Sequence, residues 1–247
     1  MDHGSGAPAT GLLASIVSRG AETLGISLPS GAPAAFEKYH DLLEQRGRNV
    51  NLTAISTVED VARLHFLDSM APLKTAIFAN KRVIDIGSGA GFPGAPLAIA
   101  EPTIKLALLD ATGKRIAFLT ELCAMLGIDA ALHHARAEDA AHDTKLRERF
   151  DIAVSRAVAD LNTLCEMCLP FVSIGGRFLA MKGSGSDAEI ENARGAIKTL
   201  GAEISGIHDY TIPETDIVHR IVTIKKIAPT PGEYPRRFAK MKKNPLK

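Results

Sequence analysis

The sequence contains no tryptophan, only three tyrosines and three cysteines, and no long apolar run. Three cysteines are too few for the disulfide framework of a secreted domain, so we expect a reducing compartment. No apolar stretch approaches the roughly 18 to 20 residues that a membrane span needs, and the first residues lack the basic and apolar regions of an export signal. These absences predict a cytoplasmic protein with no membrane partner.

Potential metal ligands are present, but their spacing is not typical of a metal site. Cys165 and Cys168 have the CxxC spacing inside a helical-looking segment, without the second pair that would complete a zinc site. The eight histidines are scattered, and neither the pair His133 and His134 nor His219 has neighbours typical of metal ligands. We therefore predict no metal.

The chain has 247 residues, 46% of them hydrophobic, which is enough for one large domain and its decorations. Residues 1–10 are small, polar and glycine-rich and are expected to be disordered. Apolar residues at helical spacing across residues 11–80, with Thr57 as a helix cap, predict an N-terminal helical extension. From residue 81 to 228, strand-like and helix-like segments alternate, which predicts an α/β domain with helices on both faces of a mostly parallel sheet.

The expected sheet has seven strands. They are predicted near residues 82–86, 104–109, 130–135, 150–155, 176–182, 203–210 and 217–226. The helices of this domain are predicted near residues 94–100, 113–127, 159–171 and 187–201. The last two strands are close in sequence, which allows an antiparallel pair at one edge of the sheet.

The net charge of +1 is unevenly distributed. From Lys225 to the end of the chain, eight basic residues stand against a single acid, Glu233. Four prolines interrupt this region, so a long helix is excluded and we expect residues 229–247 to form an extended basic tail. Such a tail either binds nucleic acid through its phosphates or serves as a solubilising terminus, and we favour the first.

Residues 83–94, Val-Ile-Asp-Ile-Gly-Ser-Gly-Ala-Gly-Phe-Pro-Gly, are the most informative part of the sequence. A strand leads into a loop in which Gly87, Gly89 and Gly91 allow a tight turn and a close approach to a ligand, because glycine has no Cβ. The glycine spacing suits both S-adenosylmethionine and a dinucleotide. Asp85 favours S-adenosylmethionine, since a carboxylate repels a pyrophosphate but complements an ammonium and a sulfonium.

The ends of the other strands extend this site, because ligands of open α/β sheets bind at the carboxyl ends of the strands. Asp110 closes the second strand and is suited to accept both ribose hydroxyls of an adenosine in either cofactor class. Residues 135–139 offer an acid and backbone amides to the edge of an adenine. Arg156 and Lys182, at the next two strand ends, place positive charge at the mouth of the site.

A series of short motifs resembles the RsmG family, also called GidB, of bacterial methyltransferases of small-subunit ribosomal RNA. The motifs are Asn-Val-Asn-Leu-Thr at 49–53, His-Phe-Leu-Asp-Ser at 65–69, the glycine loop as far as Leu97, Leu-Asp-Ala-Thr-Gly-Lys-Arg at 109–115, Ser-Arg-Ala at 155–157 and Lys-Gly at 182–183. The resemblance covers residues 35–226, and the basic tail is similar to that of many members. It implies a class I, Rossmann-like methyltransferase fold and methylation of N7 of one guanosine in 16S rRNA, as naked RNA or in the small subunit.

The resemblance also implies site residues. The cofactor contacts of the family fall on Gly87, Phe92, Ala137, Glu138 and Arg156. N7 of guanine carries a lone pair and no proton, so we predict no catalytic acid or base. The candidates for positioning the guanosine or its phosphates are Asn51, His65, Asp68, Arg156 and Lys182. His65 and Asp68, three apart on a predicted helix, suit equally well a structural pair that locks the extension against the sheet.

Two other functions stay open from the sequence. A nicotinamide oxidoreductase would share the glycine spacing, although no Tyr-x-x-x-Lys pair or second substrate domain is apparent. A non-catalytic RNA-binding or ribosome-assembly factor would share the basic tail. We expect a monomer, in which Arg156→Ala weakens cofactor use. Loss of the residues after Ala228 is expected to weaken RNA binding and leave cofactor affinity near normal.

Overall fold

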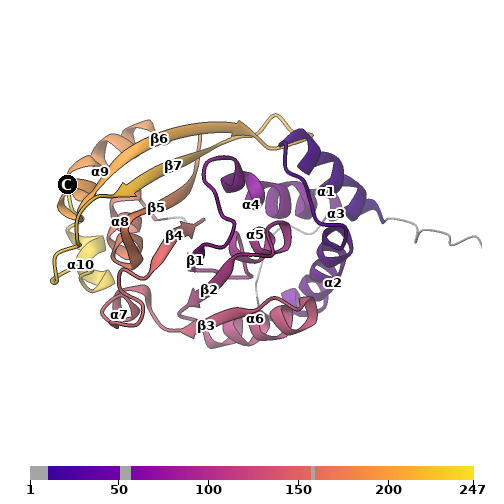
Figure 1. Cartoon of the computed structure of the whole chain (residues 1–247), viewed down its shortest axis with the longest axis horizontal. Helices are drawn as coiled ribbons and strands as arrows, with labels where there is room; N and C mark the ends of the chain where they lie inside the picture. Colours follow the sequence, from indigo (N-terminus) through magenta and orange to yellow (C-terminus); the bar gives the residue numbers. More distant parts are fainter. Residues whose placement is uncertain (1–10, 51–56, 157–158) are drawn as a thin grey trace, which may run out of the picture.

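The computed structural model describes residues 11–50, 57–156 and 159–247, and shows one sheet with helices on both faces (Figure 1). The strands are β1 (Arg82–Ile86), β2 (Lys105–Asp110), β3 (Ala130–His134), β4 (Phe150–Ser155), β5 (Val172–Gly183), β6 (Ala202–Thr211) and β7 (Val218–Lys226). The α-helices are α1 (Leu12–Thr23), α2 (Ala32–Val50), α3 (Val58–Asp60), α4 (Asp68–Met70), α5 (Gly94–Ala100), α6 (Gly113–Leu126), α7 (Ala137–Ala140), α8 (Leu161–Cys168), α9 (Asp187–Thr199) and α10 (Phe238–Lys243). A π-helix, η1 (Val61–Leu67), and two 3-10 helices, η2 (Ala71–Lys74) and η3 (Leu169–Phe171), complete the set.

The strand order in the sheet is β3-β2-β1-β4-β5-β7-β6. All neighbouring strands are parallel except the neighbours of β7, which is antiparallel to both β5 and β6. The prediction of a seven-stranded, mostly parallel sheet with an antiparallel pair at one edge is confirmed. The order reverses at β1, so the carboxyl ends of β1, β2 and β4 meet at the point where α/β sheets bind their ligands.

Successive side chains of the strands point to opposite faces and divide the interior into two cores. On one face, Val83 and Leu108 share a core with the buried sides of α1, α2, α5 and α6. On the other face, Ile84 and Leu109 share a core with α8 and α9. Both faces of the central strands β1, β2 and β4 are therefore buried, which is why these strands are almost continuously apolar.

The predicted N-terminal extension is part of the first core. The rings of Phe36, Tyr39 and Phe66 are fully buried, and the Phe66 ring contacts those of Phe36 and Tyr39 at centroid distances of 4.9 and 5.1 Å. Thr57 caps the next helix as predicted, because its hydroxyl accepts a hydrogen bond from the Asp60 N–H at 3.1 Å. The extension is thus one folding unit with the sheet.

The tail is not the extended segment that its prolines predict. The Arg236 guanidinium pairs with the buried Glu166 of α8 at 2.7 Å, and the Arg236 N–H donates to the same carboxylate. The chain then forms α10, in which Met241 is fully buried. Sequence alone misses this arrangement because the carboxylate that attracts the tail lies 70 residues away. The exposed basic residues of the tail include Arg237, Lys240, Lys242 and Lys243.

Within the described ranges, none of the helices combines the length and hydropathy needed to cross a bilayer. The same part of the chain contains no group of three or more histidine, cysteine or acidic side chains arranged to hold a metal ion. Cys165 and Cys168 are unbonded thiols inside α8, and burial raises the pKa of both. They are core side chains, in line with the helical segment predicted for them.

Candidate active site

The loop after β1 has the backbone that its glycines predict. Gly87, Gly89 and Gly91 have φ values of +76°, +59° and +99°, a region that residues with a Cβ rarely adopt. A Cβ on Gly91 would lie 2.5 Å from the Tyr39 hydroxyl. The loop is tied to β2, because the Gly89 N–H donates to the Asp110 carboxylate at 3.0 Å. Glycine is required here both for conformation and for packing.

A cavity of about 240 Å³ opens at the carboxyl ends of β1 to β4, and we call it the first cavity. Its lining residues are Ile86, Gly87, Leu109, Asp110, Ala111, Thr112, Arg115, Ala135, Arg136, Ala137, Glu138, Ser155, Leu164, Met167 and Phe238. Four of the predicted cofactor-binding residues are among them: Gly87, Asp110, Ala137 and Glu138. The structure therefore brings together side chains from four strand ends that the sequence analysis treated one by one.

The first cavity fits an adenosyl group. Asp110 lines it, and its carboxylate, oriented by the N–H groups of Gly89 and Thr112, has further lone pairs with which to accept ribose hydroxyls. A Cβ built on Gly87 would meet no atom within 4 Å, because the cavity occupies the space beside it. Leu164 and Met167 provide an apolar wall opposite the polar strand ends. This combination of one apolar wall and a few polar groups is typical of a nucleoside site.

Asp85, Gly89, Gly91, Phe92 and Arg156 do not line the first cavity, and their predicted cofactor contacts stay predictions. Asp85 is fully buried, with one oxygen accepting the Gly94 N–H at 2.9 Å and the other without a hydrogen-bond partner in the described part of the chain. Burial raises the pKa of Asp85 to about 7. A charge at this position would act on a cationic ligand through space rather than by contact.

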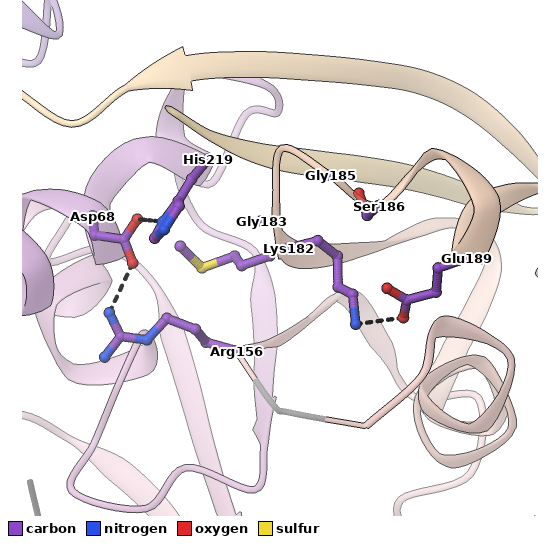
Figure 2. A pocket seen from close by; sticks show the side chains of 9 residues that line it. Asp68, Arg156, Lys182, Gly183, Gly185, Ser186, Glu189 and His219 are labelled. Carbon is purple, nitrogen blue, oxygen red and sulfur yellow. Dashed lines mark hydrogen bonds and ion pairs between the residues drawn. The ribbon is translucent and has the colours of Figure 1, made fainter. Parts of the chain in front are cut away.

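A second cavity, of about 460 Å³, lies beside the first at the ends of β4, β5 and β7. It is lined by Asp68, Arg156, Met181, Lys182, Gly183, Gly185, Ser186, Glu189 and His219 (Figure 2). The consecutive residues Ser155 and Arg156 at the end of β4 line one cavity each. Three predicted positioning residues, Asp68, Arg156 and Lys182, thus meet in a single charged hollow next to the adenosyl site.

Asp68 is the centre of a buried network in this second cavity. Its carboxylate accepts hydrogen bonds from Arg156 at 2.9 Å, from the Tyr210 hydroxyl at 2.6 Å and from His219 Nδ1 at 2.8 Å. Burial alone would raise the pKa of Asp68, but these three partners together hold it below its ordinary value. The hydrogen bond between His219 and Asp68 also raises the pKa of His219. Asp68 is therefore an ionised group that joins the N-terminal extension to β4, β6 and β7.

Arg156 is held by residues of the extension and by Phe92 of the loop after β1. It donates to the Leu64 carbonyl at 3.0 Å, lies 3.2 Å from His65 Nδ1, and stands 5.0 Å above the ring of Phe92. Phe92 in turn stacks on His65 with a centroid distance of 4.6 Å. Burial, reinforced by the Arg156 charge, lowers the pKa of His65 to about 4, so its ring is neutral at pH 7. Of these residues, Arg156 lines the second cavity, and the others hold its side chain in place.

Lys182 points across the second cavity to α9. Its ammonium pairs with Glu189 at 2.5 Å and donates to the Ala159 carbonyl at 2.8 Å (Figure 2). Ser186 lies beside them with its buried hydroxyl unpartnered among the described residues. Glu189, Ser186 and His219 are site residues that the sequence analysis missed, since no motif marks them. Asn51, the remaining predicted residue, lies outside the described residues.

Comparison with known proteins agrees with this geometry. Residues 33–218 match the GidB family, described as rRNA small subunit methyltransferase G. Proteins named ribosomal RNA small subunit methyltransferase G from Thermoanaerobacter sp. (strain X514) and Clostridium beijerinckii are 45% and 42% identical to this chain. The alignments cover 92% and 94% of this chain and 95% and 98% of theirs.

Among solved structures, the ribosomal protein L11 methylase of Lactobacillus delbrueckii subsp. bulgaricus matches with a TM-score of 0.51 and 17% identity over 67% of this chain and 79% of the other. That likeness supports the Rossmann-like methyltransferase fold alone. The sequence alignments also show the family, because they cover nearly the full length of both proteins. The chain belongs to the rRNA small subunit methyltransferase G family.

Proposed function

We propose that the protein transfers a methyl group from S-adenosylmethionine to N7 of a guanosine in 16S ribosomal RNA. The observation that carries the proposal is the pairing of two cavities at one edge of the sheet, one suited to an adenosyl group and the other lined by charged side chains. Family membership supports the same activity. The two cavities share the end of β4, so a cofactor in one and a nucleotide in the other would be neighbours.

The chemistry asks the protein mainly for positioning. S-adenosylmethionine, when bound, supplies an electrophilic methyl group on a sulfonium. N7 of guanine attacks with its own lone pair, so no residue has to remove a proton, and bringing N7 close to the methyl group supplies most of the catalysis. The purine gains the positive charge that the sulfonium loses. Asp68 and Glu189 are each paired with a cation, so the second cavity offers fixed charge pairs around the reacting groups rather than a net negative charge.

The second cavity also matches the hydrogen-bonding edge of guanine. Guanine presents N1–H and N2–H donors beside the O6 acceptor, a pattern that a carboxylate next to a cation complements. Glu189 and Lys182 form such a pair on one wall, and the Ser186 hydroxyl beside them still has its hydrogen-bonding capacity. Arg156 and His219 on the opposite wall suit a phosphate or O6. We assign the target base to this cavity.

The deciding experiment incubates the protein with labelled S-adenosylmethionine and unmethylated 16S rRNA, either naked or in small ribosomal subunits. The expected product is one labelled guanosine whose strand is cleaved by aniline after borohydride reduction, a reaction specific to N7-methylated guanosine. Label at another atom or base would refute the N7 assignment. Comparing the two substrates shows whether the partner is free RNA or the assembled subunit.

Two outcomes would favour other functions. Tight binding of NADH without binding of S-adenosylmethionine would indicate an oxidoreductase. Binding to small-subunit RNA without any methyl transfer would indicate a ribosome-assembly factor. We also propose that the protein acts as a monomer, which sedimentation at micromolar concentration tests directly.

A further inference from the structure

The first cavity has one wall that comes from the C-terminal tail. Phe238, the first residue of α10, lines it together with Leu164 and Met167 of α8. Its side chain is among the exposed large hydrophobics of the described residues, at 37%. An aromatic ring left open to solvent at the mouth of a nucleoside cavity has apolar surface that a ligand can cover.

The tail is held firmly enough to form a wall. Arg147 donates to the carbonyl oxygens of Thr230, Pro231 and Tyr234 at 2.9 to 3.1 Å. These bonds fix the segment that leads to the Arg236–Glu166 ion pair. We call residues 229–247 the C-terminal strap.

Beyond α10 the strap continues across the sheet-covering helices. The Leu246 carbonyl accepts a hydrogen bond from Asn162 of α8 at 3.2 Å, and the last residue, Lys247, lies against Gly195 of α9. Met241, fully buried between these points, packs α10 down onto the domain. The strap therefore docks over its whole length, and the position of Phe238 follows from contacts on both sides of it.

We propose that the C-terminal strap completes the cofactor pocket, with Phe238 covering the adenine ring of S-adenosylmethionine. The inference rests on the proposed function and adds a binding residue to it. Asp110 and Glu138 provide polar groups for the sugar and the base edge, whereas the opposite side of the cavity offers only apolar side chains. An adenine has a polar edge and an apolar face, and stacking of that face on an aromatic ring is a general source of affinity.

The strap then links cofactor and RNA through one short helix. Phe238 lies within five residues of Lys240, Lys242 and Lys243, all exposed and available to phosphates. RNA that contacts these lysines would bind to α10, the same helix that places Phe238 at the cofactor site. The expectation that loss of the tail leaves cofactor affinity near normal is therefore replaced by the expectation that it weakens both.

Calorimetric titration with S-adenosylmethionine, and separately with S-adenosylhomocysteine, tests the proposal without any turnover. Phe238→Ala is expected to raise the Kd of both ligands about tenfold. This lies in the lower part of the range for loss of one contact between a base and an aromatic ring, because the Phe238 ring is partly exposed. Phe238→Tyr should restore binding to within about twofold, since it keeps the ring. Ile207→Ala removes a similarly exposed apolar side chain (47% against 37%) on β6, outside the lining of the first cavity; it is the matched control and should leave both Kd values unchanged.

A second variant acts on the anchor instead of the ring. Glu166→Gln removes the charge that holds Arg236, and it should weaken cofactor binding and speed cleavage by trypsin after Arg236, with no further loss of affinity when combined with Phe238→Ala. Thermal unfolding without ligand confirms that each variant is folded. Equal affinities of wild type and Phe238→Ala would overturn the inference and leave the proposed function intact. Absence of binding by the wild type would overturn both.

Discussion

Each of the two cavities is associated with a buried aspartate, and the two carboxyl groups behave in opposite ways. Asp85, two residues before Gly87 of the first cavity, has a pKa raised to about 7 by burial, whereas the pKa of Asp68 in the second cavity is lowered. Their exposures are nearly equal, at 0% and 1%. Asp68 accepts three hydrogen bonds from side chains, and one oxygen of Asp85 accepts none. The donors around a carboxyl group, not its depth, therefore decide its ionisation here.

The two carboxylates therefore affect stability differently when they are ionised. Asp68 stabilises the fold because it joins four elements that are far apart in sequence. Asp85 costs the fold stability whenever it is ionised, which suits a group retained for a cationic ligand. The predictions below test this contrast, beginning with the change expected to have the largest effect.

Asp68→Asn should be the most damaging substitution. It removes the charge that compensates Arg156 and the carboxylate that accepts from His219, and breaking a buried ion pair in this way costs about 3 to 5 kcal/mol of unfolding free energy. Urea unfolding at pH 7 measures the loss. Asp216→Asn, at an exposed carboxylate, is the control and should change stability by less than about 0.5 kcal/mol. Equal stabilities of the two variants would show that the network contributes nothing.

Asp85→Asn should raise the free energy of unfolding, whereas Asp68→Asn lowers it. The pKa of Asp85 in the fold, about 7, lies above its ordinary value of 3.8, so the folded state binds the proton more strongly and loses stability as pH rises from about 4 to 7. At pH 8 the variant should therefore be more stable than wild type by about 2 to 4 kcal/mol. Near pH 3 both side chains are neutral, and the difference should vanish.

The same variant separates stability from function. Without the carboxylate, the affinity for S-adenosylmethionine at pH 8 should fall although the fold is stronger, because the ligand carries an ammonium and a sulfonium. A variant that is less stable at pH 8, or one that binds the cofactor more tightly, would contradict the role given to Asp85.

Paired substitutions should separate the two cavities kinetically. Lys182→Met is expected to lower kcat/KM for the RNA about tenfold, or ~1.4 kcal/mol, and to leave the Kd of S-adenosylmethionine unchanged. Asp110→Ala should instead weaken the binding of S-adenosylmethionine by about 2 kcal/mol, because hydrogen bonds to a charged group are lost. RNA binding, measured by filter retention, should be normal for Asp110→Ala. A change in cofactor affinity with Lys182→Met would mean that the cavities do not act separately.

Tyr210→Phe should give the smallest effect. It removes one of three donors to Asp68 and leaves the charges in place, so we expect a loss of about 1 kcal/mol in unfolding free energy. The pKa of Asp68 should rise towards its ordinary value, which NMR titration of the carboxyl carbon can follow. No rise in that pKa would show that Arg156 and His219 hold the ionised form by themselves.

The sequence predicted the parts of the site that are formed by neighbouring residues. The glycine loop, Asp110 and the pair Ala137 and Glu138 each follow directly on a strand, and the parallel sheet brings strand ends together without further information. The sheet itself could be predicted because its apolar strands alternate with helical segments. The antiparallel edge followed from the short connection between the last two strands.

The remaining parts depend on contacts between distant residues. Tyr210 and His219 reach Asp68 from 142 and 151 residues further along the chain, and no local pattern marks either of them. The docked tail was missed for the same reason, since its prolines exclude a long helix but do not reveal the buried Glu166 that fixes Arg236. Motifs identified Asp68 and Arg156 as site residues, but not the network that holds them.

The position of β7 has a consequence for synthesis on the ribosome. β7 is the last strand to be made, yet it lies between β5 and β6 and supplies Ile221 to the core that contains α1 and α2. A nascent chain shorter than 226 residues therefore presents two unpaired strand edges and an incompletely covered apolar face, both of which promote aggregation. Chaperone protection during translation should be needed until almost the whole chain has left the exit tunnel.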